Sequence, residues 1–399
     1  MALYQLSSAR GADTAGAALP RLVESVCFAL IVSHVVFLLA SLVKGSWLIE
    51  SDGGVASDFV NVWAAGKLAL AGHAASTYDW AIHKAAEESA VGHSFDGYFG
   101  WHYPPTFLFV AAALATLPYL AAALVWLMAT LAAYAAALAG IVGSRAGIFL
   151  ALGFPAVLWN ATAGQNGFLT AALLGGTLGL MERRPALAGI CLGLLSYKPQ
   201  FGLLFPLVLI ADRRWLTFAV AALVAIALAA LSWLAFGSAT WEAFMHWTPI
   251  TGRVVLGEGA AGWSRLQSLF GFMRAHGADE QLAWTVQAAG TLALAAGLVW
   301  LWRSRVAFEL KAAALAAGTL LATPYVYIYD LVALAVAVAF LVRFALARGF
   351  LASELVGLPC AGALILIYPY QATQVGLAAA LIVLALAAQR AILTSAPAK

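Results

Sequence analysis

The sequence predicts an all-α polytopic membrane protein, and its composition and the length of its apolar runs support this prediction. Of its 399 residues, 64% are hydrophobic and 10% are charged, and the mean hydropathy is +0.92. Soluble domains carry about 25% charged residues, so this chain has too little polar surface to fold in water. Apolar runs long enough to cross a bilayer recur from Leu22 onward, which predicts one membrane domain over residues 1–399.

The apolar runs give the expected helices in chain order. The first, residues 22–43, has full spanning length, so we expect a retained helix rather than a cleaved signal peptide. Further spans are expected at residues 120–142, 215–236, 282–302, 311–323, 330–346, 350–368 and 375–388. Shorter or interrupted runs lie at residues 104–117, 148–159, 167–181 and 186–210. Together they predict about eleven to thirteen membrane segments.

The positions of the charged residues predict the orientation. Basic clusters should face the cytoplasm, and they lie at Arg10 and Arg21, Arg183 and Arg184, Arg213 and Arg214, Arg303 and Arg305, and Arg343 and Arg348. Residues 1–21 are then a cytoplasmic N-terminus, residues 44–104 a first extracytoplasmic loop and residues 237–281 a second large one. Strict alternation leaves Arg145 or one later pair on the wrong side. Half-spanning helices around residues 159–210 would remove this conflict.

The long first loop is expected to carry two interfacial helices. Its charge fits a translocated segment, because residues 44–103 hold seven carboxylates, three lysines and no arginine. Apolar residues at helical spacing over residues 58–71 predict a helix lying on the membrane surface, with Ser57 as its N-cap. A second helix is expected over residues 80–91.

Asp58 is the first candidate for chemistry, because it opens the expected interfacial helix soon after the first span. A carboxylate in that place can act as general base and take a proton from an acceptor hydroxyl. The alternative is a charge that only complements the helix dipole, worth roughly 0.3–1 kcal/mol.

His102 and Tyr103 are candidates where the first loop returns to the membrane. A purely structural interpretation accounts for the two prolines, which suit a helix start, and for the aromatic residues, which suit the membrane interface. It accounts less well for His102. Four of the seven histidines lie in this loop, and their spacing is not that of a metal site. No metal is expected.

Lys198 interrupts an otherwise apolar stretch at membrane depth. An ionisable group there costs about 2.5–3.5 kcal/mol on insertion scales and suggests a functional site. Pro199 bends the segment and frees a carbonyl, and a lysine suits binding of a phosphate. Snorkelling of the amine to the membrane surface is the alternative.

Two polar breaks between apolar runs contain further candidates. Gln165 and Asn166 lie in the first break, which could be a plain turn. Tyr329 and Asp330 lie in the second, where Asp330 could be only a helix cap.

The second large loop combines basic and aromatic residues. It holds His246, Arg253 and Arg265 among several tryptophans. This combination suits binding of sugar rings and phosphates, although tryptophan is also common at any membrane surface.

An ordered set of short motifs runs through this chain from about Leu22 to Leu331. The motifs are Ser57-Asp58-Phe59, Gly72, Thr77-Tyr78-Asp79, Tyr103-Pro104-Pro105, Leu117-Pro118, Gly164-Gln165-Asn166-Gly167, Arg183-Arg184-Pro185, Ala188-Gly189, Lys198-Pro199 and Arg213-Arg214-Trp215. Taken together, they resemble the membrane glycosyltransferases of family 87, a polyprenol-phosphate-mannose-dependent mannosyltransferase-like group with the GT-C fold.

The resemblance implies a GT-C-type bundle that transfers a hexose, mannose by analogy, with inversion. The donor would be a polyprenyl-phosphate sugar and the acceptor a lipid-linked or cell-envelope glycan, at the outer face of the cytoplasmic (inner) membrane. Asp58 matches the family's loop-one aspartate, the general base. Lys198, Arg253, Arg265 and His246 are candidates to balance the charge of the leaving phosphate. No nucleotide cofactor is needed, metal is not clearly required, and no nucleic-acid partner is expected.

One departure from the family pattern leaves the donor sugar open. Many members carry a tryptophan and paired histidines after the proline that matches Pro324, whereas this chain has Tyr325, Tyr327 and Tyr329.

A transporter or lipid flippase is the chief alternative function, with Lys198 and Asp330 lining its path. A polymerase or ligase of envelope polysaccharide is a third possibility. The chain has no internal sequence repeat, which weakens the interpretation as an inverted-repeat transporter.

Overall fold

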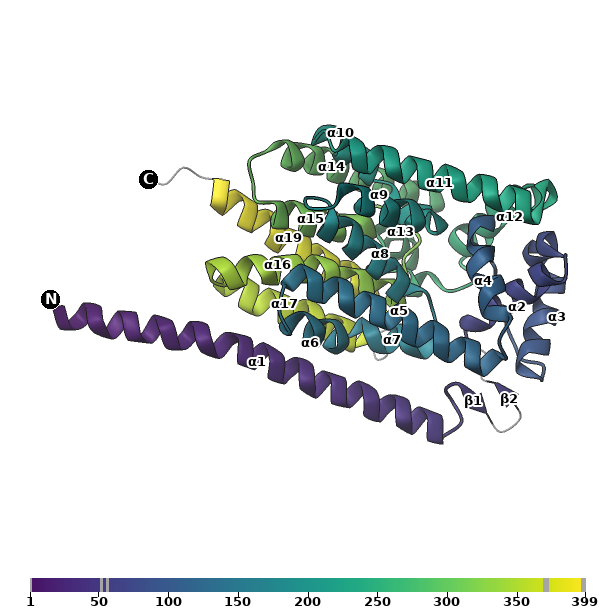
Figure 1. Ribbon diagram of the computed structural model, residues 1–399, viewed down its shortest axis with the longest axis horizontal. Coiled ribbons are helices and arrows are strands. Elements are labelled where there is room, and N and C mark those ends of the chain that lie inside the picture. The colour runs from purple at the N-terminus through teal and green to yellow at the C-terminus, as the bar shows by residue number, and fades with distance from the viewer. Residues whose placement is uncertain (1, 51–52, 55–56, 369–372, 396–399) are drawn as a thin grey trace.

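The computed structural model describes residues 2–50, 53–54, 57–368 and 373–395, and these form a bundle of helices (Figure 1). The α-helices are α1 (Ala2–Val43), α2 (Phe59–Leu70), α3 (Trp80–Val91), α4 (Leu108–Ala115), α5 (Tyr119–Val142), α6 (Ala146–Gly153), α7 (Ala156–Ala163), α8 (Gly167–Leu180), α9 (Pro185–Leu194), α10 (Phe205–Ala211), α11 (Trp215–Phe236), α12 (Ser238–Gly252), α13 (Leu269–Ala275), α14 (Glu280–Arg303), α15 (Phe308–Leu321), α16 (Leu334–Arg348), α17 (Ala352–Leu366) and α19 (Val375–Ser395). Short 3-10 helices lie at Ala74–Tyr78, Pro105–Phe107, Leu195–Tyr197, Pro199–Gly202, Trp263–Arg265 and Ile328–Ala333, and a π-helical turn at Arg253–Gly257. Two short strands, β1 (Ile49–Glu50) and β2 (Gly53–Gly54), pair antiparallel.

The prediction of an all-α polytopic membrane protein is confirmed. Within the described residues, six helices are long and apolar enough to cross a bilayer, and α6 with α7 forms a possible seventh span bent by 58°. Six shorter apolar helices accompany them. The expected eleven to thirteen membrane segments are therefore reached only when shorter helices are counted as well.

Most helices have bounds close to the expected ones. The bounds of α3 and α11 are as expected, and α5 begins one residue earlier than expected. The run at residues 186–210 is interrupted as expected, since α9 ends at Leu194 and α10 begins at Phe205, with Lys198 and Pro199 between them.

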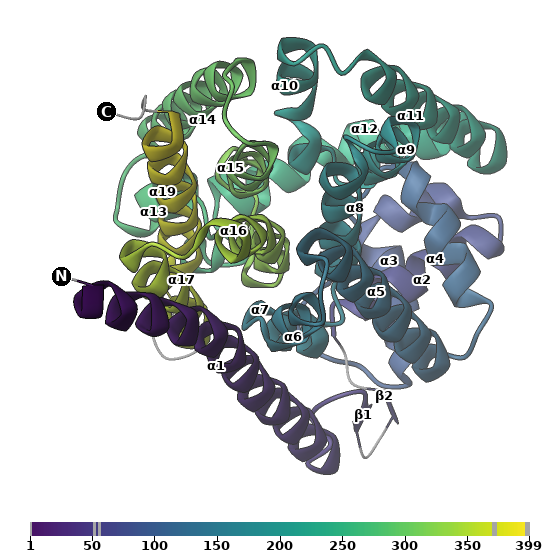
Figure 2. The same cartoon turned by 60° about the vertical axis from the view of Figure 1, so that its left-hand side comes forward.

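Helices α15 and α16 form the axis of the bundle (Figure 2). Within the span that includes α16, 83% of the apolar window is buried, against 6% for α11 and 11% for α1. Every residue of α15 from position 310 to 321 is buried, and five of these twelve are alanine. Such small side chains let neighbouring helices approach closely in a bilayer, where packing rather than water expulsion drives association.

Charged groups connect several helix ends at one end of the bundle. Arg214, before α11, lies 2.7 Å from Asp212, after α10, and 3.9 Å from Glu182, after α8. Lys311, in the first turn of α15, lies 3.9 Å from Asp212. We call this end of the bundle the basic end.

Helices α5 and α16 end there as well. Arg343 of α16 lies 3.4 Å from Glu309 in the first turn of α15 and donates a hydrogen bond to the carbonyl oxygen of Ile141 of α5 at 3.2 Å. Arg145, which follows α5, therefore lies at the same end as the later arginine pairs.

The re-entrant pair α9 and α10 removes the conflict over the basic residues. Helix α9 begins at the basic end, where the Thr217 hydroxyl of α11 donates to the carbonyl oxygen of Pro185 at 3.1 Å. Helix α10 returns to the same end at Asp212. The chain thus enters and leaves the bundle on one side and turns at residues 195–202. The half-spanning helices expected in this region are present.

Helices α2, α3 and α12 lie at the opposite end of the bundle, where the two short strands also lie (Figure 1). Helix α2 differs from the expected surface helix, because seven of its twelve residues are buried, including Asn61 and Ala65 on the face expected to be polar. Its N-cap is Asp58 rather than Ser57. Gly66 explains the burial, since a Cβ there would lie 2.0 Å from the carbonyl oxygen of Ala111 in α4. The backbones of α2 and α4 are thus in direct contact.

The shared basic end predicts a labelling pattern in membrane vesicles. Single cysteines in place of Ser144 and Glu182, in a variant lacking the three native cysteines, should react with an impermeant thiol reagent from the same side. A cysteine in place of Ser94, which is exposed after α3, should react only from the other side. Labelling of positions 144 and 182 from opposite sides would contradict the shared basic end.

Candidate functional site

Asp58 lies directly before α2, at the end of the bundle opposite the basic end, and Gln165 holds its carboxylate. The Gln165 side-chain amide donates a hydrogen bond to Asp58 Oδ2 at 2.9 Å. The amide oxygen of Gln165 accepts hydrogen bonds from the Tyr103 hydroxyl at 3.3 Å and from the Asn166 backbone at 3.2 Å. Asp58 is partly exposed, whereas Gln165 is buried. A substrate hydroxyl can therefore reach a carboxylate whose orientation the protein fixes.

Gly164 makes the approach of Gln165 to Asp58 possible. Its φ of +68° lies in the left-handed region, which glycine adopts without steric cost. A Cβ at this position would lie 2.9 Å from the Cβ of Phe59 and 3.3 Å from the hydroxyl of Ser57. A larger residue would therefore separate the turn from the segment that carries Asp58.

Gly167 makes a second close approach on the other side of the turn. A Cβ there would lie 2.4 Å from the carbonyl oxygen of Tyr329 and 2.5 Å from Oδ1 of Asn160. The Gly167 backbone N–H donates to that same Asn160 oxygen at 2.8 Å. The break at residues 164–167 is thus a turn that also joins the Asp58 segment to the Tyr329 segment.

Tyr197 connects this turn to the tip of the re-entrant pair. Its hydroxyl lies 2.7 Å from the hydroxyl of Thr170 and donates to the Asn166 carbonyl oxygen at 3.3 Å. Its ring stacks on Phe107 with 4.6 Å between centroids and lies 6.2 Å from the Tyr103 ring. These contacts fix the position of residue 198, the next along the chain.

Lys198 and Asp330 form a buried ion pair. Lys198 Nζ lies 2.6 Å from Asp330 Oδ1, and the two side chains are 6% and 2% exposed. Asp330 Oδ2 also accepts the Tyr327 backbone N–H at 3.1 Å, so Asp330 is a helix cap and an ion-pair partner together. Snorkelling of Lys198 is excluded, because its amine ends in this pair. Its charge is already balanced by a carboxylate.

Three partly exposed tyrosines follow Pro324. Tyr325 and Tyr327 meet edge to face at 5.2 Å, and Tyr327 stacks on Tyr329 at 5.5 Å. Lys198 Nζ lies 5.7 Å from the centre of the Tyr329 ring. Aromatic faces of this kind suit contact with a sugar ring.

Arg265 is the exposed cation of the site. Its positive charge lowers the pKa values of both the Asp58 carboxyl and the Tyr327 hydroxyl, so it lies near both groups. Unlike Lys198, its guanidinium is on the exposed side of the site.

Burial raises the pKa of Asp58 to about 6. The hydrogen bond from Gln165 and the charges of Lys198 and Arg265 act in the opposite direction, and the charge of Asp330 adds to the rise. A carboxylate with this pKa is ionised at neutral pH and remains a stronger base than an ordinary aspartate. Such a value suits general base catalysis.

His102 is half-buried next to the site, close to the buried residues His83 and Glu87. Burial lowers its pKa to about 4, and it lies near enough to His83 to affect that residue's pKa. His83 Nε2 lies 3.5 Å from Glu87 Oε1, and both side chains are fully buried. Burial lowers the pKa of His83 to about 3 and raises that of Glu87 to about 8, so the pair is neutral at pH 7. Within the described residues, no three His, Cys, Asp or Glu side chains are grouped to hold a metal ion.

We call the candidate residues around Asp58 the Asp58 group; they are Asp58, Tyr103, Gln165, Asn166, Lys198, Arg265, Tyr329 and Asp330. His246 and Arg253 lie apart from this group. His246 is exposed on α12, where its ring meets that of Trp247 at 5.6 Å. Arg253 is exposed and lies 3.4 Å from the exposed Glu258. The structure therefore brings eight of the eleven sequence-predicted residues into one region. His102 lies beside this region, and His246 and Arg253 lie apart from it.

The sequence analysis missed residues that position the site. Tyr197, Phe107 and Thr170 were not among the candidates. The pairing of His83 with Glu87 could have been predicted from the sequence, because residues four apart on a helix share one face.

The comparisons with known proteins identify the family. Residues 101–324, more than half of the chain, match the model of glycosyltransferase family 87. The chain belongs to glycosyltransferase family 87. It is therefore a membrane glycosyltransferase, as the ordered motifs suggested. No curated protein and no solved structure matched the chain. Asp58 lies outside the matched residues of this glycosyltransferase, so its role rests on the geometry around it.

The ion pair predicts an unusual pattern among variants of this glycosyltransferase. Lys198→Met or Asp330→Leu alone should destabilise the protein by about 3–5 kcal/mol, because each leaves an unpaired buried charge. The double variant Lys198→Met/Asp330→Leu should recover most of that stability. Thermal unfolding in detergent measures both effects.

Activity of the double variant then separates structure from function. If the pair only holds the fold, the stable double variant keeps its transfer activity. Loss of activity in a double variant that unfolds at the wild-type temperature shows a direct role in substrate binding. Equal destabilisation of the double variant and the single variants would contradict the coupling.

Proposed function

We propose that this glycosyltransferase moves a hexose, mannose by analogy, from a polyprenyl-phosphate sugar to a hydroxyl of a lipid-linked or cell-envelope glycan. The observation that carries the proposal is Asp58, a partly exposed carboxylate held by Gln165 beside Lys198 and Arg265. A base next to positive charge is the combination that a hydroxyl acceptor and a phosphate leaving group require.

The proposed reaction is a single displacement. Asp58 takes the proton of the acceptor hydroxyl as the acceptor oxygen attacks the anomeric carbon of the donor sugar. The bond from that carbon to the phosphate oxygen breaks, and the polyprenyl phosphate leaves with the electron pair. Because attack and departure occur on opposite faces of the carbon, the anomeric configuration inverts. The polyprenyl phosphate supplies the leaving group, so no nucleotide takes part.

Arg265 is the preferred partner of the leaving phosphate. Its guanidinium is exposed and can form two parallel hydrogen bonds with phosphate oxygens. Lys198 does not contact the phosphate in this proposal, because its amine is already paired with Asp330. It acts on the phosphate only through the electrostatic effect of its charge. In this assignment Lys198 holds the site together, and Arg265 makes the direct contact.

The sugar would lie against the tyrosines that follow Pro324. Tyr327 and Tyr329 stack on each other and leave part of their surface exposed. Gln165 and Tyr103 orient the base from the other side.

The proposed location is the extracytoplasmic face of the cytoplasmic membrane. The support is the segregation of the arginine pairs to the end of the bundle away from Asp58, which by the positive-inside rule would be cytoplasmic.

A transporter that uses Lys198 and Asp330 to line its path is the second candidate. The 2.6 Å contact between these two buried side chains favours it, because ionisable groups inside a membrane often mark transport paths. Such a protein needs no base at Asp58, so the two functions differ in the effect of one substitution.

Transfer of labelled sugar tests the proposal. Wild-type protein is expected to transfer label from polyprenyl-phosphate mannose or polyprenyl-phosphate glucose to membrane lipids. Asp58→Asn should lower the rate by about 100-fold or more, because a general base contributes 10²–10⁴-fold. Asp96→Asn, at an exposed carboxylate of the same loop, is the matched control and should keep the wild-type rate. Equal transfer rates from wild type and Asp58→Asn would contradict the role of Asp58 as base, and no transfer from either donor would favour the transporter.

The pH dependence gives an independent test of the base. Asp58 must be ionised to accept a proton, so kcat/KM should rise with pH and level off above about 6. Gln165→Leu removes a hydrogen bond that stabilises the carboxylate and should move this midpoint upward. A kcat/KM profile that is flat between pH 5 and 7, a window set by that pKa of about 6, would contradict the assignment.

A further inference from the structure

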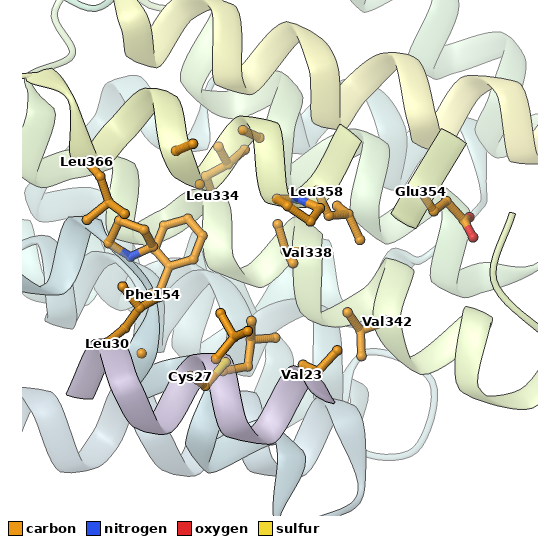
Figure 3. Close-up of a pocket in the computed structure, with 18 of the residues that line it drawn as sticks. Val23, Cys27, Leu30, Phe154, Leu334, Val338, Val342, Glu354, Leu358 and Leu366 are labelled. Carbon is orange, nitrogen blue, oxygen red and sulfur yellow. The ribbon is translucent and has the colours of Figure 1, made fainter. Parts of the chain in front are cut away.

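A cavity of about 360 Å³ lies among the membrane-spanning helices, away from the Asp58 group (Figure 3). Helices α1, α6, α16 and α17 line it with apolar side chains that include Cys27, Leu30, Phe154 and Leu358. The carboxylate of Glu354 lies at one end of the cavity.

Glu354 does not make the cavity polar. Arg390 Nε lies 3.1 Å from its Oε1, and the two side chains are 7% and 1% exposed, so the charge is balanced within the protein. Glu354 Oε2 also accepts the backbone N–H of Leu351 at 2.8 Å. The cavity therefore offers a polar ligand no free charged partner.

Backbone geometry keeps the cavity open. Helix α1 touches α6 at Gly153, where a Cβ would lie 2.8 Å from the Cα of Cys27. Pro155 then separates α6 from α7, and the axis bends by 58°. On α17, Gly362 has no side chain, and a Cβ there would lie 3.7 Å from Pro155. The bend and the glycine leave space that side chains of ordinary size would fill.

The cavity opens to the surface that faces the bilayer. Val26 of α1 and Leu355 of α17 line it, and they are 52% and 43% exposed. Water would find few hydrogen-bond partners in such a cavity. Because the surroundings of the spanning helices are hydrocarbon, a hydrocarbon chain is the occupant that the lining fits.

The end of the cavity opposite Glu354 lies at Phe154 and Leu366, next to the start of α7 (Figure 3). Helix α7 starts next to Pro155 in the cavity wall and ends at Gly164, which touches the segment that carries Asp58. Its eight residues span ~12 Å. On α16, Leu334 lines the cavity one turn after Asp330. The inner end of the cavity is thus about one short helix away from the site.

We infer that this cavity binds the distal isoprenoid chain of the lipid-phosphate donor. The inference rests on the proposed function, because it assigns the donor's phosphate to the Asp58 end. From there a long chain would follow α7 and α16 into the membrane and reach the space between α1 and α17. A short isoprenoid chain would end before it reached the cavity. The cavity would therefore give the enzyme a preference for long-chain donors.

The test compares two tryptophan substitutions on α17. Leu358→Trp places a large side chain in the cavity wall, whereas Val356→Trp adds the same side chain at a position that is 64% exposed and does not line the cavity. KM and kcat are measured for a long-chain polyprenyl-phosphate mannose and for geranyl-phosphate mannose. Comparison of two donors within one variant removes the effect of any loss of folded enzyme.

Only KM for the long-chain donor is expected to change. Leu358→Trp should raise KM for the long-chain donor about tenfold, and it should leave KM for the geranyl donor and both kcat values unchanged. Val356→Trp should change none of them. If wild type and Leu358→Trp show the same ratio of KM values, the inference is overturned, and a phospholipid lost from Leu358→Trp in native mass spectrometry would identify a structural lipid instead. If wild type uses neither chain length with mannose or with glucose as the sugar, the proposed function fails and the inference with it.

Discussion

The turn at Gly164-Gln165-Asn166-Gly167 is the constraint on which the site depends. Gly164 lies against the segment that carries Asp58, and Gly167 lies against the backbone of Tyr329. Both approaches are closer than a Cβ would allow. Between the two glycines, Gln165 orients the base. The Trp126 indole secures the turn by donating to the Gly164 carbonyl oxygen at 3.2 Å.

Buried charge imposes the second constraint. A lysine inside a membrane bundle is stable only when a carboxylate balances it, and Lys198 has Asp330 at 2.6 Å. The re-entrant pair α9 and α10 brings Lys198 inward without carrying the adjacent arginines across the membrane. The re-entrant pair thus places Lys198 inside the bundle and keeps the neighbouring arginines at the basic end.

Much of this structure could be predicted from local sequence. The bounds of α3 and α11, the break around Lys198 and the half-spanning helices follow from hydropathy, proline and charge position. The burial of α2 could not be predicted in this way. Its period of apolar residues fits a surface helix, and only the contact of Gly66 with Ala111 of α4 shows that protein covers its other face.

For the site, too, local sequence predicted some features and not others. Lys198 was identifiable because an ionisable residue in apolar surroundings is costly, Asp58 because it opens the helix after the first span, and Gln165 and Asp330 because they lie in polar breaks between apolar runs. Their pairing was not, since 107 residues separate the first two and 132 the last two. The fold likewise decides that Arg265 acts on the Asp58 carboxyl whereas Arg253 pairs with Glu258, and the spacing of these arginines along the chain did not predict it.

The contrast between the buried axis of α15 and α16 and the lightly covered α1 and α11 has a consequence for how substrates arrive. Lipid is about as apolar as the outer helices, so moving one of them sideways loses packing contacts but exposes nothing to water. The core can stay intact during such a movement. The lipid-linked donor and acceptor of the proposed reaction would then reach the enzyme by two-dimensional diffusion within the leaflet, and their concentration in the membrane, rather than in the surrounding water, would govern how fast they are captured.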